Sequence, residues 1–203
     1  MSLSHCHHWI FDMDGTLTQP VHDFDWIRAE LGIEMGNPIL EAIGRMPAAA
    51  AEEAKVKLDE LEMELAWKAV AQPGAEAFLQ ALRDKGLALG ILTRNGEHIA
   101  QATLEACGLL GFFEQEVVIG RETCAPKPEP DGVEYLVNYW GADRSNTVIV
   151  GDYRYDIEAG RACGIQTVHF DTAGQFQWPE FMDYGVMSFS ELHEIAFTSG
   201  VAA

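Results

Sequence analysis

Two aspartates separated by one residue follow a short apolar run near the start of the chain. The run Trp9–Phe11 leads into Asp12, Met13 and Asp14, and a Gly-Thr pair comes next. A short apolar run bounded by glycine predicts a buried strand, and open α/β folds place their active sites at the carboxyl ends of such strands. Because carboxylates this close repel each other, either one keeps a proton or a cation lies between them.

A second polar segment follows the apolar run Leu87–Leu92. It begins with Thr93, Arg94 and Asn95, and a helix is expected from Glu97 onward. A hydroxyl group beside a helix N-terminus is suited to bind a phosphate or another oxyanion. An ordinary helix N-cap explains the same pattern equally well.

A lysine stands among three prolines further along the chain. Lys127 lies between Pro126 and Pro128, with Pro130 close behind. Prolines fix φ and stiffen a loop, so the lysine could be held in one place. A lone lysine is otherwise usually a solvated charge.

The run Thr147–Val150 repeats the opening pattern. It ends in Gly151 and Asp152, and Asp156 comes four residues later. If the strands are parallel neighbours, four carboxylates lie together at one edge of the sheet: Asp12, Asp14, Asp152 and Asp156. Their negative charge needs a nearby positive charge to balance it. Hard oxygen ligands indicate Mg²⁺, with Lys127 as a fixed positive charge.

The composition limits the function further. The chain has 203 residues, 48% of them hydrophobic, and a formal net charge of −19. Such an acidic surface repels phosphate backbones, so we expect no nucleic-acid partner. No run approaches the roughly 18 apolar residues of a membrane span, and the N-terminus lacks the pattern of a secretory signal. We therefore expect a soluble cytoplasmic protein.

Cysteine and histidine residues add little to this picture. The spacing of the four cysteines matches neither a disulfide framework nor a metal site. We therefore expect reduced thiols, as in a cytoplasmic protein. The segment His5-Cys6-His7-His8 could chelate a transition metal, but no further ligand pair is visible. We expect a frayed, incidental N-terminus instead.

Apolar runs alternate with helical stretches over most of the chain. This alternation predicts βαβ units around a mainly parallel sheet, which is a three-layer, Rossmann-like α/β/α core. The expected strands are Trp9–Phe11, Leu87–Leu92, Val117–Ile119, Thr147–Val150 and Gln166–Phe170. The expected helices are Pro73–Lys85, Glu97–Cys107, Asp131–Trp140, Tyr155–Cys163 and Ser190–Phe197, the last with Ser190 as N-cap.

One stretch interrupts the alternation. Residues 19–72 show no strand pattern, and Ala48–Ala71 is rich in strong helix formers. Asp23–Leu31 and Pro38–Ile43 are expected to be shorter helices. We therefore expect a helical cap of residues 19–72, inserted after the first strand into a core of residues 1–18 and 73–203. Leucines at helical spacing on the long helix are expected to pack on neighbouring helices.

Taken together, the four polar segments resemble the haloacid dehalogenase superfamily of hydrolases. The match comprises Asp-x-Asp-Gly-Thr-Leu-Thr from Asp12, then Thr93, Lys127, and Gly151-Asp152 with Asp156, in the family's order. The resemblance is strongest to the phosphoglycolate-phosphatase-like branch, whose helical cap follows the first motif. The expected cap is shorter than is usual in that branch, and the cap supplies much of the family's specificity.

The resemblance implies a role for each matched residue. Asp12 would be the nucleophile that forms an aspartyl-phosphate, and Asp14 the acid that protonates the leaving oxygen and then activates water. Asp12, the backbone carbonyl of Asp14 and Asp152 would hold Mg²⁺. Thr93 and Lys127 would bind phosphoryl oxygens. Asp156 would orient Lys127 or a metal-bound water.

Three further residues are candidates for contact with a substrate. Arg94 and Asn95 are expected to line the site, although a surface salt bridge fits Arg94 as well. Arg45 lies between two helical stretches of the expected cap. It could bind the part of an anionic substrate beyond its phosphoryl group, or it could be a solvated charge.

We therefore predict a Mg²⁺-dependent phosphatase acting on a small phosphomonoester, either phosphoglycolate-like or a sugar phosphate. Within the superfamily, a dehalogenase or a phosphonate hydrolase is disfavoured because Asp14 is present. A phosphomutase stays open because it keeps both aspartates, and so does a non-catalytic phospho-ligand-binding module. The sequence leaves open whether the protein is a monomer or a homodimer.

Overall fold

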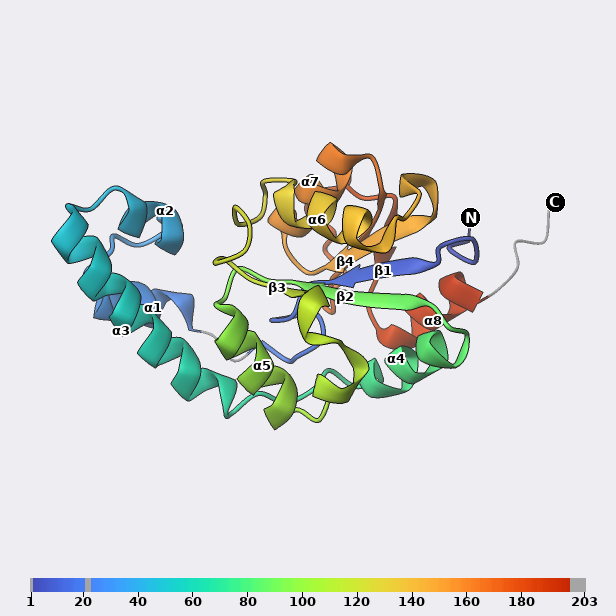
Figure 1. Ribbon diagram of the computed structural model, residues 1–203, viewed down its shortest axis with the longest axis horizontal. Coiled ribbons are helices and arrows are strands. Elements are labelled where there is room, and N and C mark those ends of the chain that lie inside the picture. Colours follow the sequence, from blue (N-terminus) through green and yellow to red (C-terminus); the bar gives the residue numbers. More distant parts are fainter. Residues whose placement is uncertain (1, 21–22, 198–203) are drawn as a thin grey trace.

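Six parallel strands form one sheet in the computed structural model of the protein, which describes residues 2–20 and 23–197. Their order across the sheet is β3-β2-β1-β4-β5-β6 (Figure 1). The strands are β1 (His8–Phe11), β2 (Ala88–Leu92), β3 (Val118–Ile119), β4 (Thr147–Gly151), β5 (Gln166–Phe170) and β6 (Tyr184–Val186). The parts of the expected domains that fall on residues 1, 21–22 and 198–203 lie outside the described residues.

Helices cover both faces of this sheet. In Figure 1, α6 and α7 lie on one face, and α4, α5 and α8 lie on the other. Their bounds are α4 (Ala75–Asp84), α5 (Glu97–Ala106), α6 (Asp131–Trp140), α7 (Arg154–Cys163) and α8 (Phe189–Phe197), with short 3₁₀ turns η1 (Leu110–Phe112), η2 (Gln115–Val117) and η3 (Arg144–Asn146). The predicted three-layer α/β/α fold is therefore confirmed.

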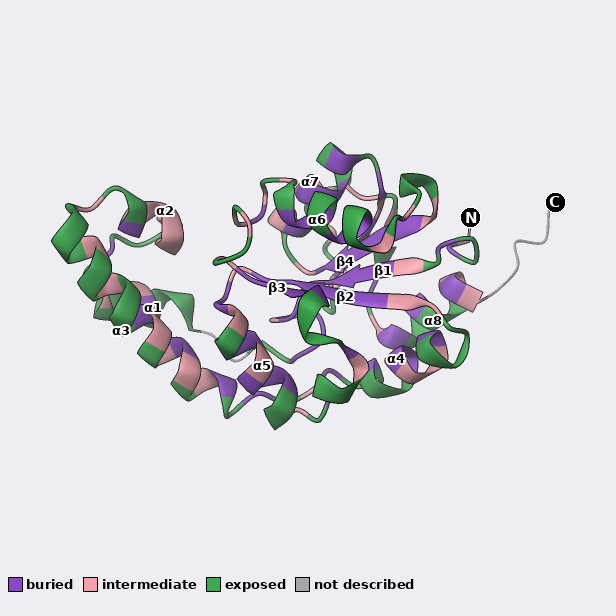
Figure 2. Cartoon of the chain, viewed as in Figure 1, coloured by how far each residue is buried: buried purple, intermediate pink, exposed green. Residues whose placement is uncertain are grey.

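The sheet is buried because its strands are apolar on both faces. Trp9, Ile10 and Phe11 of β1 are all buried, as expected of a central parallel strand with helices on either side. Phe78 of α4 packs its ring edge-on against Trp9, with ring centroids 5.4 Å apart. Figure 2 shows this buried layer running through the middle of the larger part of the molecule.

Three helices follow β1 and form a separate lobe. They are α1 (Phe24–Glu30), α2 (Ile39–Gly44) and α3 (Ala48–Ala66). The lobe has its own small core of Ile27, Ile33, Ile43 and Leu58. Leu61 and Leu65 pack against this cluster, so the leucine stripe of α3 contacts neighbouring helices as predicted. We call residues 23–66 the helical lobe.

The long helix α3 also contacts the sheet-bearing part. Ala66 near its end packs with Ile99 and Ala102 of α5 in a third apolar cluster. Figure 1 shows α3 running from α2 down to α5. The N-terminal part of α3 therefore packs in the lobe's own core, and its C-terminal end packs on α5, the helix that follows β2.

Several element boundaries differ from the predictions. The long helix ends at Ala66 rather than Ala71, because the chain beyond it pairs with the segment after β1: Gln19 N donates to Val70 O at 2.8 Å, and Gln72 N donates to Leu17 O at 2.8 Å. Strand β6 was not predicted. Its three residues include Gly185 at the centre, so no alternating pattern is visible.

The two ends of the core also differ from expectation. Helix α8 begins at Phe189, and Ser188 rather than Ser190 accepts a hydrogen bond from Glu191 N at 3.2 Å. The prediction of a frayed N-terminus is wrong for the described part: Leu3 and Cys6 are buried, and Leu3 N donates to Ile195 O at 2.8 Å. Apolar packing against α8 and β1 fixes this segment.

Among the described residues, no helix combines the length and the apolar character needed to cross a membrane.

Candidate active site

The carboxyl end of β1 places the first aspartate beside β4. Asp12 N donates to Val150 O at 2.9 Å, so strand pairing continues one residue past β1. The Asp12 side chain is thereby held at the edge of the sheet, and the residue is only 8% exposed. Thr16, which sequence reasoning did not single out, donates its hydroxyl to Asp12 Oδ2 at 3.4 Å.

Lys127 lies inside the protein, with each of its three donors bound. Its Nζ atom is 2.6 Å from Asp12 Oδ1, 2.7 Å from Asp156 Oδ1 and 2.5 Å from the backbone oxygen of Leu92. The residue is 1% exposed. An ammonium group has three donors and no acceptor, so this set satisfies it fully. Lys127 is therefore a fixed charge that contacts the ends of β1 and β2 and the first turn of α7.

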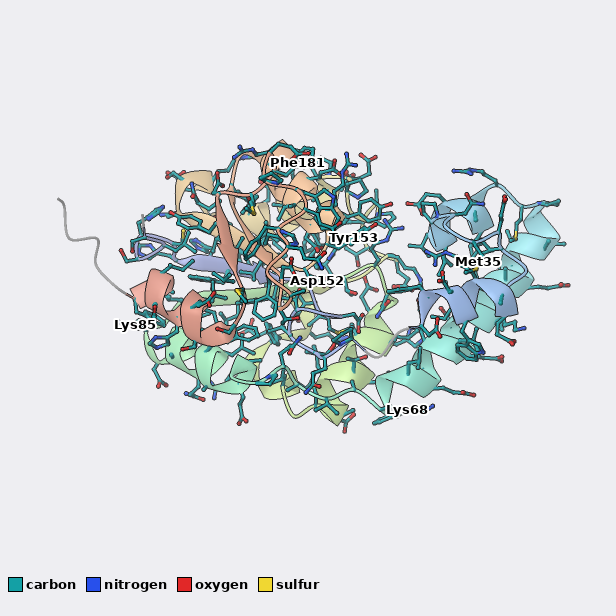
Figure 3. All side chains as sticks on the ribbon, turned by 180° about the vertical axis from the view of Figure 1, so that it is seen from behind. Met35, Lys68, Lys85, Asp152, Tyr153 and Phe181 are labelled. Carbon is teal, nitrogen blue, oxygen red and sulfur yellow. The ribbon has the colours of Figure 1, made fainter. Side chains whose placement is uncertain are left out.

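Asp152 lies in the turn between β4 and α7, and Asp156 lies in the first turn of α7. Asp156 Oδ2 accepts from Tyr153 N at 2.9 Å, which caps the helix and fixes the carboxylate. One carboxylate oxygen from each of Asp12, Asp152 and Asp156 lies within 4.8 Å of the others. Figure 3 shows Asp152 at the middle of the molecule, where the strand ends meet the loops.

Burial and mutual repulsion act strongly on these acids. Burial raises the pKa of Asp12 above its usual range, although Lys127 opposes the shift. Burial and the charges of Asp12 and Asp156 raise the pKa of Asp152 well above its usual range. Burial raises the pKa of Asp156 to about 6 against the opposing charge of Lys127. Burial lowers the pKa of Lys127, but the charges of Asp12 and Asp156 outweigh it and raise that pKa overall.

These carboxylates fit a divalent cation. Three carboxylates lie together here, those of Asp12 and Asp156 buried and that of Asp152 half-buried, and a single lysine cannot balance their charge. The donors are all carboxylate oxygens, the type that Mg²⁺ prefers. Gly15, at φ +88°, approaches this group so closely that a Cβ atom there would lie 2.2 Å from Asp152 Oδ2. The glycine after Asp14 thus leaves the space that Asp152 fills.

The loop after β2 contacts the second aspartate. Thr93 is buried, and its hydroxyl oxygen accepts from Asn95 N at 3.1 Å. The side chain of Asn95 donates from Nδ2 to Asp14 Oδ2 at 2.6 Å. Asp14 is half-buried and its carboxylate is not part of the Asp12, Asp152 and Asp156 group. The two aspartates of the motif therefore have different partners.

Arg94 crosses from this loop to the helical lobe. Its Nη2 atom is 2.9 Å from both carboxylate oxygens of Glu41 on α2. Its Nη1 atom donates to the backbone oxygen of Lys127, and its guanidinium carbon lies 4.8 Å from the ring centre of Tyr155. The ion pair expected as one possibility for Arg94 is present, and it joins lobe and core beside the site.

Arg45 is not brought into this group. It is exposed and follows the last residue of α2, the helix that carries Glu41. Sequence reasoning missed Glu41 itself and also Arg121, whose side chain joins α3 to the loop after β2. Arg121 could have been found: it comes two residues after the expected strand Val117–Ile119, and strand ends had marked the other candidates.

Comparison with known proteins agrees with this arrangement. Residues 8–164 match the family model of the haloacid dehalogenase-like hydrolases. A probable phosphatase of Dickeya dadantii is 27% identical over 186 residues, covering 78% of each chain. A phosphoglycolate phosphatase of Aquifex aeolicus is 29% identical over 175 residues, covering 78% of this chain and 81% of its own.

Solved structures share the fold. A hydrolase from Pseudomonas syringae superposes with a TM-score of 0.77 at 23% identity, covering 94% of this chain and 99% of its own. With the family match spanning most of the chain and the relatives covering both lobe and core, the earlier resemblance is confirmed. The chain belongs to the haloacid dehalogenase-like hydrolase family and is an enzyme of the phosphatase type.

Proposed function

We propose that the protein is a Mg²⁺-dependent phosphatase that hydrolyses a small phosphomonoester through a phosphorylated Asp12. The observation that carries this proposal is the buried pair of Asp12 and Lys127, with Asp152 beside it at the carboxyl edge of the sheet. Lys127 shields the charge of Asp12 and would also neutralise an incoming phosphoryl group.

Asp12 is proposed as the nucleophile. One of its carboxylate oxygens attacks phosphorus, and the bond from phosphorus to the ester oxygen breaks. The hydrogen bond from Thr16 and the ion pair with Lys127 hold the carboxylate in place for that attack. Water then attacks phosphorus of the aspartyl-phosphate, which releases inorganic phosphate and restores the Asp12 carboxylate.

Asp14 is proposed to move the protons. It gives a proton to the leaving ester oxygen in the first step and takes one from the attacking water in the second. Its different surroundings support this division: it accepts from the neutral amide of Asn95 at 2.6 Å, whereas Asp12 faces a lysine. Two acids in different environments can hold different protonation states.

We propose that Asp12, Asp152 and the backbone carbonyl of Asp14 hold the Mg²⁺. Bound there, Mg²⁺ would neutralise negative charge between the phosphate and the nucleophile. Asp156 also lies in the acidic group, where Lys127 binds one of its oxygens and Tyr153 N the other. Its proposed role is to orient Lys127.

The remaining residues are proposed to bind the substrate. Thr93, Asn95 and the backbone amides after Thr93 are proposed to hold phosphoryl oxygens. Arg94 and Arg45 are candidates for reading the rest of the ester, although Glu41 already pairs with Arg94 in the structure. The substrate class that we propose is a phosphoglycolate-like acid or a sugar phosphate, since the Aquifex aeolicus relative is a phosphoglycolate phosphatase.

We also propose that the enzyme works in a reducing compartment such as the cytoplasm. All four cysteines are free, and two of them, Cys6 and Cys163, are buried in the apolar core. Apolar packing accounts for these two thiols without a disulfide.

Phosphate release from a panel of esters tests the proposal directly. The panel comprises phosphoglycolate, sugar phosphates, nucleotides and phosphoamino acids, each with Mg²⁺ and with a chelator. We expect metal-dependent release that falls by at least about a thousandfold in Asp12→Asn, since the nucleophile is lost. Asp84→Asn, the same change at an exposed position on α4, is the matched control and should keep full activity.

Other outcomes separate the alternatives. Full activity in Asp12→Asn would overturn the mechanism. Isomerised sugar phosphate without net phosphate release would identify a phosphomutase. A chain that neither releases phosphate nor binds fluoroberyllate in the presence of Mg²⁺ would be a non-catalytic module.

A further inference from the structure

We propose that Arg121 is a positioning residue that couples the docking of the helical lobe to the loop after β2, and through that loop to Asp14. The inference rests on the proposed function, in which this loop binds the phosphoryl group and Asp14 moves protons. Arg121 follows β3 and comes no closer to the reaction than this loop, so its effect must pass through other residues.

Arg121 first holds the backbone of the loop. Its Nη1 atom donates to Arg94 O at 3.2 Å, and its own backbone N donates to Asn95 O at 3.1 Å. Two successive carbonyl groups are therefore fixed by one residue. Because a peptide unit is planar, holding both carbonyls restricts the orientation of the backbone between Arg94 and Gly96.

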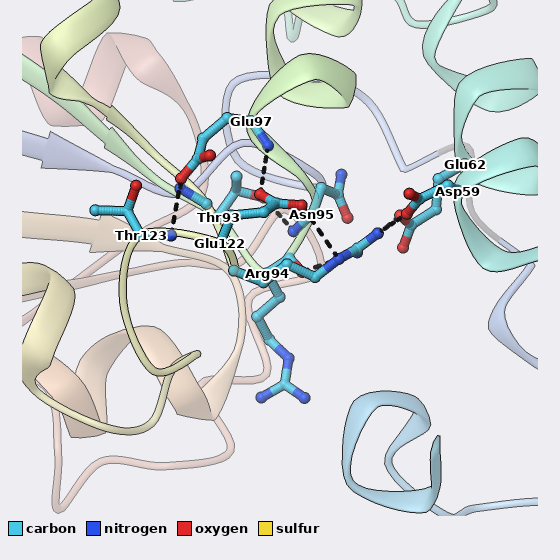
Figure 4. A network of polar contacts seen from close by, with 10 residues as sticks. Asp59, Glu62, Thr93, Arg94, Asn95, Glu97, Glu122 and Thr123 are labelled. Carbon is cyan, nitrogen blue, oxygen red and sulfur yellow. Dashed lines mark hydrogen bonds and ion pairs between the residues drawn. The ribbon is translucent and has the colours of Figure 1, made fainter. Parts of the chain in front are cut away.

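The same guanidinium binds the helical lobe. Its Nη1 atom is 2.8 Å from Glu62 Oε2, and its Nη2 atom pairs with Asp59 Oδ1. Residues three apart lie on one face of a helix, so α3 presents both carboxylates together. Figure 4 shows Asp59 and Glu62 on α3 facing the loop that carries Thr93, Arg94 and Asn95. The Arg121 side chain is only 15% exposed, which strengthens these contacts.

The segment around Arg121 is itself fixed to the core. Glu97 at the start of α5 accepts from Gly120 N at 3.0 Å and from Thr123 N at 3.1 Å. Glu97 N in turn donates to Glu122 Oε2 at 3.0 Å. Arg121 therefore extends from a rigid base, and any movement of α3 against the core acts on its guanidinium group.

The loop passes this constraint to the catalytic acid. Asn95, whose carbonyl is held by Arg121, donates its side-chain amide to Asp14 at 2.6 Å. A shift of the loop would move this amide away from Asp14 and displace Thr93. Misplacing a reacting group by about 1 Å can cost on the order of a hundredfold in rate. The docked lobe thus sets the geometry of the site without touching the reacting atoms.

Kinetics of two arginine variants test the positioning role. Arg121→Met should lower kcat by about 10- to 100-fold, and Arg121→Lys should recover part of the loss because it keeps one charge. Arg144→Met is the matched control, since Arg144 also binds a backbone carbonyl and a carboxylate, Cys163 O at 2.5 Å and Glu134 at 3.5 Å, away from the site. A kcat within twofold of the unaltered enzyme for Arg121→Met, or an equal loss in Arg144→Met, would overturn the proposal.

Hydrogen exchange tests the coupling without relying on turnover. The double variant Asp59→Asn, Glu62→Gln removes only the lobe side of the Arg121 contacts. Coupling predicts faster amide exchange both in α3 and in residues 91–97, whereas faster exchange in α3 alone would contradict it. A chain that shows the coupled change but hydrolyses no ester would keep this inference and reject the proposed function. If Arg121→Met fails to fold, hydrogen exchange of the double variant still tests whether the lobe and the loop are coupled.

Discussion

The charge of Lys127 is retained inside the protein only because three acceptors surround it. Removing an ammonium group from water costs several kcal/mol, and a buried ion pair offsets this only when its geometry is good. Here Asp12, Asp156 and the backbone oxygen of Leu92 accept one hydrogen bond each. Because a buried ion pair is a weak source of stability, we propose that Lys127 serves the chemistry proposed for Asp12 rather than folding.

Glu62 on α3 gives a prediction about pH. Burial, with smaller contributions from the charges of Asp14 and Asp59, raises its pKa from 4.5 to about 7 against the opposing charge of Arg121. Between these two values the folded protein holds a proton that the unfolded chain has lost. The contribution of Glu62 to stability is therefore greatest below about pH 4.5 and falls as pH rises to about 7.

Urea unfolding of Glu62→Gln beside the unaltered protein measures this contribution. Glutamine does not titrate, so between pH 5 and pH 8 the variant should gain roughly 2 kcal/mol in the free energy of unfolding relative to the unaltered protein. Glu134→Gln, at an exposed ion pair, should show almost no such change. If the free energies of unfolding of Glu62→Gln and the unaltered protein differ by the same amount across this pH range, the pKa of Glu62 is not raised in the folded protein.

At this scale, strand ends were the informative signal in the sequence. Asp12, Thr93 and Asp152 follow apolar runs, and the structure brings them to one edge of the sheet with Lys127. Glu41 and Glu62 could not be found in this way. Their partners Arg94 and Arg121 lie 53 and 59 residues away in sequence, and only the fold of the helical lobe brings them together.

At the scale of elements, tertiary pairing outweighed local preference in two places. Residues 67–71 have helix-forming composition, yet the bridge between Thr18 and Ala71 pulls them away from α3. Strand β6 has little preference of its own, and it forms because β5 offers an unpaired edge. In contrast, α5, α6 and α7 begin or end near their predicted residues, because glycines at their ends and apolar spacing along them act locally.

The contact of α7 with the sheet gives a prediction about packing. A Cβ atom at Gly160 would lie 2.4 Å from Ile149 Cγ2 on β4 and 2.8 Å from Thr167 Cγ2 on β5. Gly160→Ala should therefore lower the free energy of unfolding by about 1–3 kcal/mol, because α7 must shift away from both strands. Denaturant unfolding measures this change.

Gly111 is the matched control for that change. It lies in η1, its φ is not positive, and a Cβ atom there would meet nothing within 4 Å. Gly111→Ala should be neutral or stabilise by about 0.5 kcal/mol, because alanine restricts the unfolded chain. Equal losses for Gly160→Ala and Gly111→Ala would mean that the close approach of α7 to the sheet does not limit stability.

At the scale of the whole molecule, the helical lobe and the sheet have separate apolar cores. Ile27, Ile43 and Leu58 form a cluster distinct from the one around the sheet. Between them lie the packing of α3 on α5 and the charged pairs of Arg94 and Arg121. We propose that residues 19–72 are a cap and that residues 1–18 and 73–203 are the catalytic core, which would fold without the cap.

Deleting the cap tests this division, and the chain offers a natural place for the cut. Gln19 N donates to Val70 O at 2.8 Å, so the two ends of the insertion are already paired side by side. A short glycine-rich turn can therefore replace residues 20–69. The shortened chain should unfold in one cooperative transition and keep Mg²⁺-dependent hydrolysis of a small ester, because Asp12, Asp14, Lys127 and Asp152 all remain.

The loss of the cap should nevertheless change the kinetics in a definite way. Without Asp59 and Glu62, Arg121 keeps its bonds to the loop but loses its partners on α3. We expect a lower kcat and weaker discrimination among esters, with Asp12→Asn still abolishing activity in the shortened chain. Circular dichroism and ester kinetics measure both effects. A shortened chain that fails to fold would show that cap and core form one cooperative unit, whereas unchanged discrimination would place specificity in the core.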